Sequence, residues 1–196
     1  MLGQISPSLI ILIMAVCLIL LMIQDFRLAA AALGVQYLLA FLFITLVLPT
    51  GLALVKLLVG WMVTALFISE WRLIGEDWKN RTAVSGNILR GGVVMLLWIV
   101  LYLALPLLQV WFPVNRNLLL GGMILISSGM IQVGLSRQVL RIAFGLLTLF
   151  SGFEIIYAAL EPSVLVSGLL ALVNIGIGLT GLFLAVQGRE ENEVVP

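Results

Sequence analysis

The chain has 196 residues, of which 63% are hydrophobic and only 10% are charged, and its net charge is +1. A soluble domain carries roughly 25% charged residues, so this chain has too few charges to cover a water-facing surface. The composition therefore predicts an all-α integral membrane protein whose solvent is lipid. The small net charge argues against nucleic acid as a partner, because no basic stripe is present.

Histidine is missing from the sequence, and the single cysteine, Cys17, lies inside an apolar run. The usual metal ligand, the usual general base near neutral pH and any disulfide framework are therefore excluded. We expect no metal site, no cofactor and no catalytic site of the chain's own. We also expect no cleavable signal peptide, because the first apolar run lacks a basic region before it and a small-residue cleavage site after it.

Seven apolar runs approach the roughly 20 residues that a bilayer-crossing helix needs. They cover residues 8–23, 28–48, 52–69, 91–111, 118–135, 139–160 and 163–187. Residues 70–90 form the only sizeable polar loop, with a turn signal at Ser85-Gly86-Asn87. Pro106 is expected to kink the fourth helix, and residues 188–196 form a short acidic tail.

The basic residues give this layout an orientation. Of the ten Lys and Arg residues, Lys56 lies within a run and Arg116 falls on one side, so the other eight fall on the opposite side. These eight are Arg27, Arg72, Lys79, Arg81, Arg90, Arg137, Arg141 and Arg189. The positive-inside rule then predicts an outer N-terminus and a cytoplasmic C-terminus in a multi-pass protein of the cell (inner, cytoplasmic) membrane. Trp71, Trp78 and Trp111 lie near run ends, as interfacial anchors do.

The single membrane domain is predicted to divide into two three-helix units, residues 8–69 and 118–187, joined by the helix at 91–111. Each unit has a polar elbow with arginine, then a glycine, then a proline turn. These are Asp25-Phe26-Arg27, Gly34 and Pro49 in the first unit, and Ser136-Arg137-Gln138, Gly145 and Pro162 in the second. Parallel repeats of this kind occur in transport proteins, and a chance match is the alternative.

Two ionisable residues lie inside the apolar runs, Lys56 in the third and Glu154 in the sixth. Each is one to two turns from the outer end of its helix, roughly 6–10 Å deep, so the two side chains are expected at similar depth. An intramembrane charge marks an ion path by default. The alternatives are that Lys56 snorkels to the outer interface and that Glu154 is a protonated carboxyl bonded between helices.

The neutral polar residues of the runs are Gln36, Gln109, Gln132, Thr148, Ser151 and Asn174. Asn174 lies near the middle of the seventh run, where it is a further ion-path candidate or interhelical glue. The glycines of the same run predict a close-packing stripe: Gly168, Gly176, Gly178 and Gly181. Arg137 and Arg141 begin the sixth run, where we expect them to set topology and contact lipid headgroups.

The stretch from Ser136 to Gly145, followed by Gly152-Phe153-Glu154, resembles the second-helix entry of the K-type subunit of respiratory complex I. It is more similar still to the hydrogenase-4 component E family, as is the run Lys56-Leu57-Leu58-Val59. The resemblance implies a small subunit of an antiporter-like membrane arm, as in complex I, membrane-bound hydrogenases and multisubunit cation/proton antiporters. Partners would be large antiporter-like membrane subunits.

The chain departs from the pattern of that family at two positions. The carboxylate expected early in the sixth run falls on residues 147–150, which carry no acid, and the acidic position of the last helix falls on Asn174. Glu154 is then the one intramembrane acid. Three functions remain open: an ion-path subunit using Lys56, Glu154 and Asn174, a purely structural subunit of an energy-converting complex, or a small standalone permease.

Overall fold

The computed structural model describes residues 7–71 and 84–194, with the side chains of 84–88 and 189–194 excepted. This part of the chain is all-helical, as the composition predicts. Its helices are α1 (Pro7–Met22), α2 (Phe26–Ile44), α3 (Thr50–Ser69), α5 (Val84–Trp111), α6 (Arg116–Leu135), α7 (Val139–Leu160) and α8 (Val164–Val194). Six of them, α2 to α8, are long and apolar enough to cross a membrane, and α1 is a shorter apolar helix of 16 residues.

The helices agree with the predicted runs to within two residues, except around α5 and α8 and at the end of α2, which ends at Ile44 rather than at residue 48. The predicted polar loop at 70–90 is wrong for residues 84–90, which belong to α5. Ser85-Gly86-Asn87 lies in the first turn of that helix, where backbone N–H groups lack an intrahelical partner and turn-forming residues are tolerated. The predicted tail is helical as far as Val194. Residues 72–83, which include Trp78, lie outside the described residues.

Local capping explains where the second and sixth helices begin. The Asp25 carboxylate accepts a hydrogen bond from the Arg27 backbone N–H (2.9 Å), and the Asn115 side chain accepts one from the Asn117 N–H (3.0 Å). Both residues are the N-caps of their helices, a position that Asp and Asn favour. The polar elbow at Asp25 is therefore a helix start.

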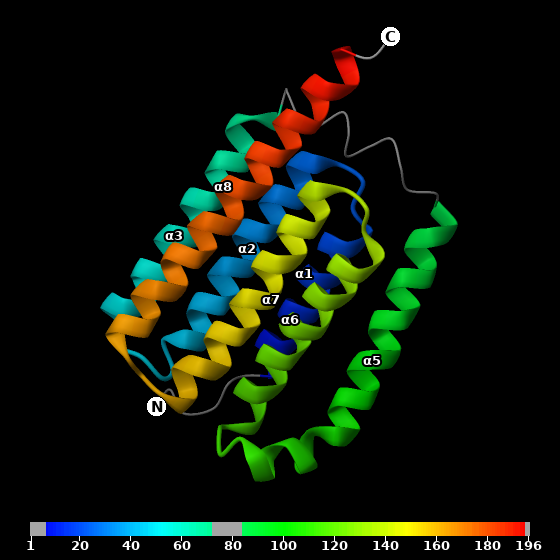
Figure 1. Cartoon of the computed structure of the whole chain (residues 1–196). Coiled ribbons are helices and arrows are strands. Elements are labelled where there is room, and N and C mark those ends of the chain that lie inside the picture. The colour runs from blue at the N-terminus through cyan, green and yellow to red at the C-terminus, as the bar shows by residue number, and fades with distance from the viewer. Residues whose placement is uncertain (1–6, 72–83, 195–196) are drawn as a thin grey trace.

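The helices form two layers of three, with α5 beside them (Figure 1). In one layer α2 packs between α1 and α3, and in the other α7 packs between α6 and α8. Each helix also packs on its counterpart in the other layer: α1 on α6, α2 on α7 and α3 on α8. Within the most apolar stretch of α5, only 17% of the residues are buried. This helix, which contains Pro106, changes direction near its end (Figure 1).

Glycines let α6 and α7 approach closely. A Cβ added at Gly129 would meet the Gly145 carbonyl, and a Cβ added at Gly152 would meet the Gly122 carbonyl, at 2.5 Å each. Such contacts are too short for any side chain, so the two backbones pack directly on each other. The close pair fixes the position of α7, the helix that carries four of the eleven buried polar residues in the described part of the chain.

Arginines bond to helix ends at one end of the bundle. Arg141 donates to the Ile23 carbonyl just after α1 (3.3 Å), and Arg90 donates to the Leu135 carbonyl at the end of α6 (2.7 Å). The Arg27 guanidinium stacks on the Trp71 ring (3.2 Å to its centroid). The last carbonyls of a helix have no intrahelical partner, and lipid offers them no hydrogen-bond donor. Arg141 and Arg90 supply donors to these carbonyls.

Candidate functional site

One face of α7 carries a line of buried side chains that crosses much of the bundle. Arg141, Phe144, Thr148, Ser151 and Glu154 are spaced three or four residues apart, and all are buried. This spacing places side chains on the same face of a helix, and Glu154 lies 13 residues after Arg141, a rise of about 20 Å along the helix. The face points into the bundle, toward α2, α3 and α8.

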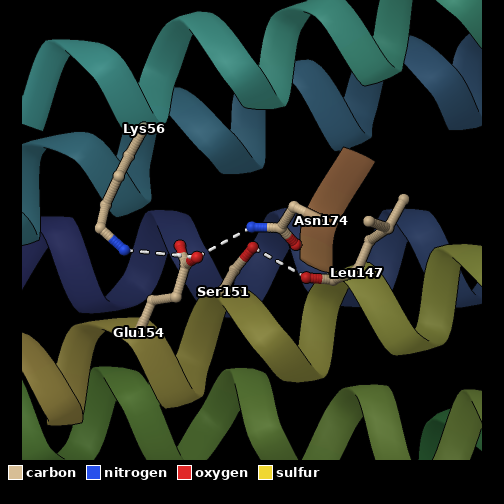
Figure 2. Close-up of polar contacts among 5 residues, drawn as sticks. All are labelled: Lys56, Leu147, Ser151, Glu154 and Asn174. Atoms are coloured by element: carbon tan, nitrogen blue, oxygen red, sulfur yellow. Dashed lines mark hydrogen bonds and ion pairs between the residues drawn. The ribbon is translucent and has the colours of Figure 1, made fainter. Parts of the chain in front are cut away.

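An ion pair lies at one end of this line. Lys56 Nζ of α3 lies 3.3 Å from Glu154 Oε1, and the side chains are only 5% and 4% exposed. Asn174 Nδ2 of α8 donates to the same carboxylate oxygen at 2.9 Å. Figure 2 shows the three side chains pointing toward one another from three helices. The three residues that the sequence singled out as ion-path candidates therefore meet in one cluster.

The cluster lies well inside the apolar part of the helices. Lys56 is six residues after the start of α3, and Glu154 is six residues before the end of α7, so each is about 9 Å from its helix end. Lys56 points into the bundle rather than to the interface, which contradicts the snorkelling interpretation. The ammonium takes part in the ion pair but makes no hydrogen bond with the described residues.

A second group of polar side chains follows along α7. The Thr148 hydroxyl lies 3.2 Å from Gln36 Oε1 of α2 and 2.8 Å from the Phe144 carbonyl. The Ser151 hydroxyl donates to the Leu147 carbonyl (2.8 Å) (Figure 2). Gln36 Nε2 and Asn174 Oδ1 are buried and make no hydrogen bond with the described residues. Buried polar groups without partners are rare in proteins, and two of them here mark the interior as polar beyond what packing requires.

Aromatic side chains separate this polar region from the arginine end of the bundle. Phe26, Phe67 and Phe144 are buried, with ring centroids 4.9 Å apart for Phe67 and Phe144, and 5.9 Å apart for Phe26 and Phe144. On α7 itself, residues 142–147 are all apolar. The polar line is therefore interrupted between Thr148 and Arg141.

The other polar residues of the predicted runs fall into different places. Gln132 is buried on α6 with its amide nitrogen unbonded to the described residues, and Gln109 of α5 is half-buried. Arg137 is exposed, as expected for a headgroup contact, whereas Arg141 is buried and bonds to Gln138 Oε1 (3.0 Å) and to the end of α1. The headgroup role predicted for Arg141 is therefore wrong.

The predicted glycine stripe of α8 is correct for two of its four members. Gly178 lies against Val63 of α3 and Gly181 against Ala143 of α7, whereas Gly168 and Gly176 have no atom near the place of a Cβ. The stripe spans more than one face of the helix, so only the glycines turned toward α3 or α7 allow close packing.

Tyr37 of α2 belongs to the cluster, although the sequence analysis did not select it. Its side chain is 4% exposed, and its hydroxyl lies beside the Ser151 hydroxyl. The hydroxyl makes no hydrogen bond with the described residues. Tyrosine is common in membrane helices, so the residue type did not indicate a site. Its position next to the polar residue Gln36 could have indicated one.

Within the described part of the chain, no three His, Cys, Asp or Glu side chains gather as metal ligands would. The cluster consists of one ammonium, one carboxylate and one amide side chain. Comparison of the chain with protein-family models, with curated proteins and with solved structures gave no match.

Proposed function

We propose that the chain is a small integral membrane subunit of an ion-translocating, antiporter-like assembly, and that Lys56, Glu154 and Asn174 lie on its ion path. One observation carries the proposal: a lysine and a glutamate from different helices meet in the apolar interior, where an asparagine of a third helix bonds to the carboxylate. Ionisable residues at such depth are costly and mark ion or proton pathways in membrane proteins.

Stability alone does not account for the pair. Removing two charges from water has a penalty of several kcal/mol per ion, and hydrophobic residues of similar volume often serve folding equally well. The surrounding side chains supply exchange partners instead, because Ser151, Thr148 and Gln36 continue the polar line away from Glu154. A carboxylate beside hydroxyl and amide groups is an arrangement through which a proton or cation is passed.

The topology supports the same proposal. Arg27, Arg90 and Arg141 gather at one end of the bundle, and we assign that end to the cytoplasmic side of the cell membrane. The ion pair then lies in the outer half. The stacking of α1, α2 and α3 on α6, α7 and α8 supports a duplicated three-helix unit, as in transport proteins.

The alternative function is a structural subunit with no ion path of its own. The interruption of the polar line by Phe26, Phe67 and Phe144 favours it, because no described polar group continues the line on α7 through that layer. In either function the outward apolar faces of α5 and α8 would contact lipid or larger membrane subunits. Within the most apolar stretches of α5 and α8, only 17% and 28% of the residues are buried against the rest of the chain.

The experiment is to identify the proteins that co-purify with the tagged chain after solubilisation in a mild detergent. We expect large integral membrane subunits of the antiporter type in stoichiometric amounts. Recovery of the chain alone, as a homo-oligomer that moves ions in liposomes, would contradict the proposal and establish a standalone permease.

A further inference from the structure

An apolar groove lies where α5 packs against α1 and α6. Its volume is about 370 Å³, and its lining contains no charged side chain. The buried part of the lining includes Trp98, Leu120 and Ile124, and the exposed part includes Met95, Ile99 and Tyr102. α5 stands at one side of the two helix layers, and few residues in its most apolar stretch are buried (Figure 1). The groove is therefore open to whatever surrounds the bundle within the membrane.

Arg116 lies at one end of this groove. It is the first residue of α6, and Leu120 and Ile124 follow it at intervals of four residues, on the same face of the helix. Its guanidinium lies 5.5 Å from the centroid of the Tyr102 ring, which lines the groove from α5. A cation at this distance is attracted to the face of the ring. The positive charge is therefore held beside the groove, where α6 begins.

The guanidinium of Arg116 has donors to offer. It is exposed, and none of its five N–H donors has a hydrogen-bond or ion-pair partner in the part of the chain that the structure describes. Glu161, the described carboxylate that follows α7 at this end, accepts a hydrogen bond from Tyr157 of its own helix instead (3.4 Å). An arginine with open donors is suited to a phosphate group, which it binds in a bidentate way.

The length of the groove indicates a lipid chain as its occupant. From Arg116 to Ile124 the rise along α6 is about 12 Å. The lining residues of α5 run from Met95 to Leu103, which gives the same rise of about 12 Å. One leaflet contributes about half of a hydrocarbon core of about 30 Å. A helix of a partner subunit crosses the whole core and would need a groove about twice as long, whereas a lipid chain ends within one leaflet.

We propose that this groove is a binding site for one anionic phospholipid, such as phosphatidylglycerol, from the leaflet in which α6 begins. An acyl chain lies along the buried side chains of the lining, and Arg116, held over Tyr102, binds the phosphate. Under the proposed orientation this is the outer leaflet. The site is built from α1, α5 and α6 and shares no helix with the Lys56–Glu154–Asn174 cluster, so it does not depend on the ion path.

The test uses Trp98 as a reporter, because its ring lines the groove and a brominated acyl chain in contact with an indole ring quenches its fluorescence. The purified full-length chain is reconstituted in phosphatidylcholine vesicles that contain an increasing fraction of brominated phosphatidylglycerol. The signal of Trp98 is the difference between the native chain and Trp98→Phe. We expect half-quenching at a mole fraction about fivefold lower than with brominated phosphatidylcholine, the selectivity expected of one arginine near the membrane surface.

Variants of the groove separate the headgroup contact from the chain contact. Arg116→Gln should abolish the preference for phosphatidylglycerol, and Arg137→Gln, which changes an exposed arginine at the other end of the bundle, should leave it unchanged. Tyr102→Leu should weaken the preference, because the guanidinium loses the ring that holds it. Ile99→Phe should raise the mole fraction needed for both lipids, because it narrows the groove. Leu96→Phe, similarly exposed on α5 but outside the lining, is the matched control.

Native mass spectrometry of the delipidated chain keeps the inference falsifiable if Trp98→Phe does not fold. The native chain should retain one added phosphatidylglycerol in preference to phosphatidylcholine, and Arg116→Gln should show no preference. Equal quenching of Trp98 by the two lipids, or an unchanged preference in Arg116→Gln, would overturn the inference. A Trp98 signal that neither lipid quenches would also overturn it, because another protein segment would then cover the groove.

Discussion

At the scale of single residues, the Lys56–Glu154 pair holds two opposite charges in the interior of the helix bundle. The side chains are 5% and 4% exposed, and Asn174 donates a hydrogen bond to the carboxylate. Each ion is tolerated because of the other, so the pair depends strongly on both members being present. This dependence separates the effect of removing one charge from the effect of removing both.

We expect Glu154→Gln and Lys56→Met, made singly, each to destabilise the chain by about 3–5 kcal/mol, because each leaves one uncompensated buried charge. The double variant should be less destabilised than either single variant. Thermal unfolding of the purified variants measures both effects. If the double variant loses the sum of the two single losses, the charges are not coupled and the pair does not exist as described.

At the scale of helices, the position of the site follows from how α7 is held. α6 packs against α7 through glycines of both helices. The face of α7 that points into the bundle carries the line of buried side chains from Arg141 to Glu154. A rigid α6–α7 pair fixes Glu154, while α3 and α8 bring Lys56 and Asn174 to it. The site is therefore assembled by helices from both layers.

Gly129→Ala tests this helix pair, because its Cβ would meet the Gly145 carbonyl and the Leu149 backbone at 2.5 Å. We expect it to lower the melting temperature by several degrees and to weaken the coupling between Lys56 and Glu154. Gly134→Ala in the same helix has open space and should have little effect. Equal effects of the two substitutions would show that the close contact of α6 with α7 does not position the site.

The sequence predicts the helices better than the contacts between them. Residues 139–160 agree with α7 at both ends, because apolar length alone defines a membrane helix. Lys56, Glu154 and Asn174 stood out singly, as polar groups in apolar runs. Their meeting depends on the stacking of the two layers, which no local pattern encodes, and Tyr37 enters the site only through the missing side chain of Gly60.

At the scale of the whole molecule, the arginines that contact helix ends gather at one end of the helix bundle. In Figure 1, α1 begins at the end of the bundle opposite to that where α8 ends, as the alternating directions of the seven described helices require. The arginines that bond to helix ends lie together at one end, whereas Arg116, at the start of α6, lies at the other. The topology is therefore asymmetric in the way that the positive-inside rule uses.

A C-terminal fusion tests the proposed orientation. Green fluorescent protein fused after Pro196 should fluoresce, and alkaline phosphatase at the same place should be inactive, because the C-terminus is cytoplasmic under this proposal. The opposite pair of results would invert the bundle and place the Lys56–Glu154 pair in the inner half of the membrane.

The measurement that tests the functional claim most directly is ion flux by the assembled complex in native membrane vesicles, normalised to the amount of this chain in the complex. The Lys56→Met, Glu154→Gln double variant removes both charges without leaving either ion unpaired, and Glu161→Gln, exposed just beyond α7, is its matched control. We predict that the double variant assembles but that its flux falls at least about tenfold, the effect of some 1.4 kcal/mol on a rate, while the control is unchanged. Native flux in the assembled double variant would contradict the account and establish a structural role for the chain.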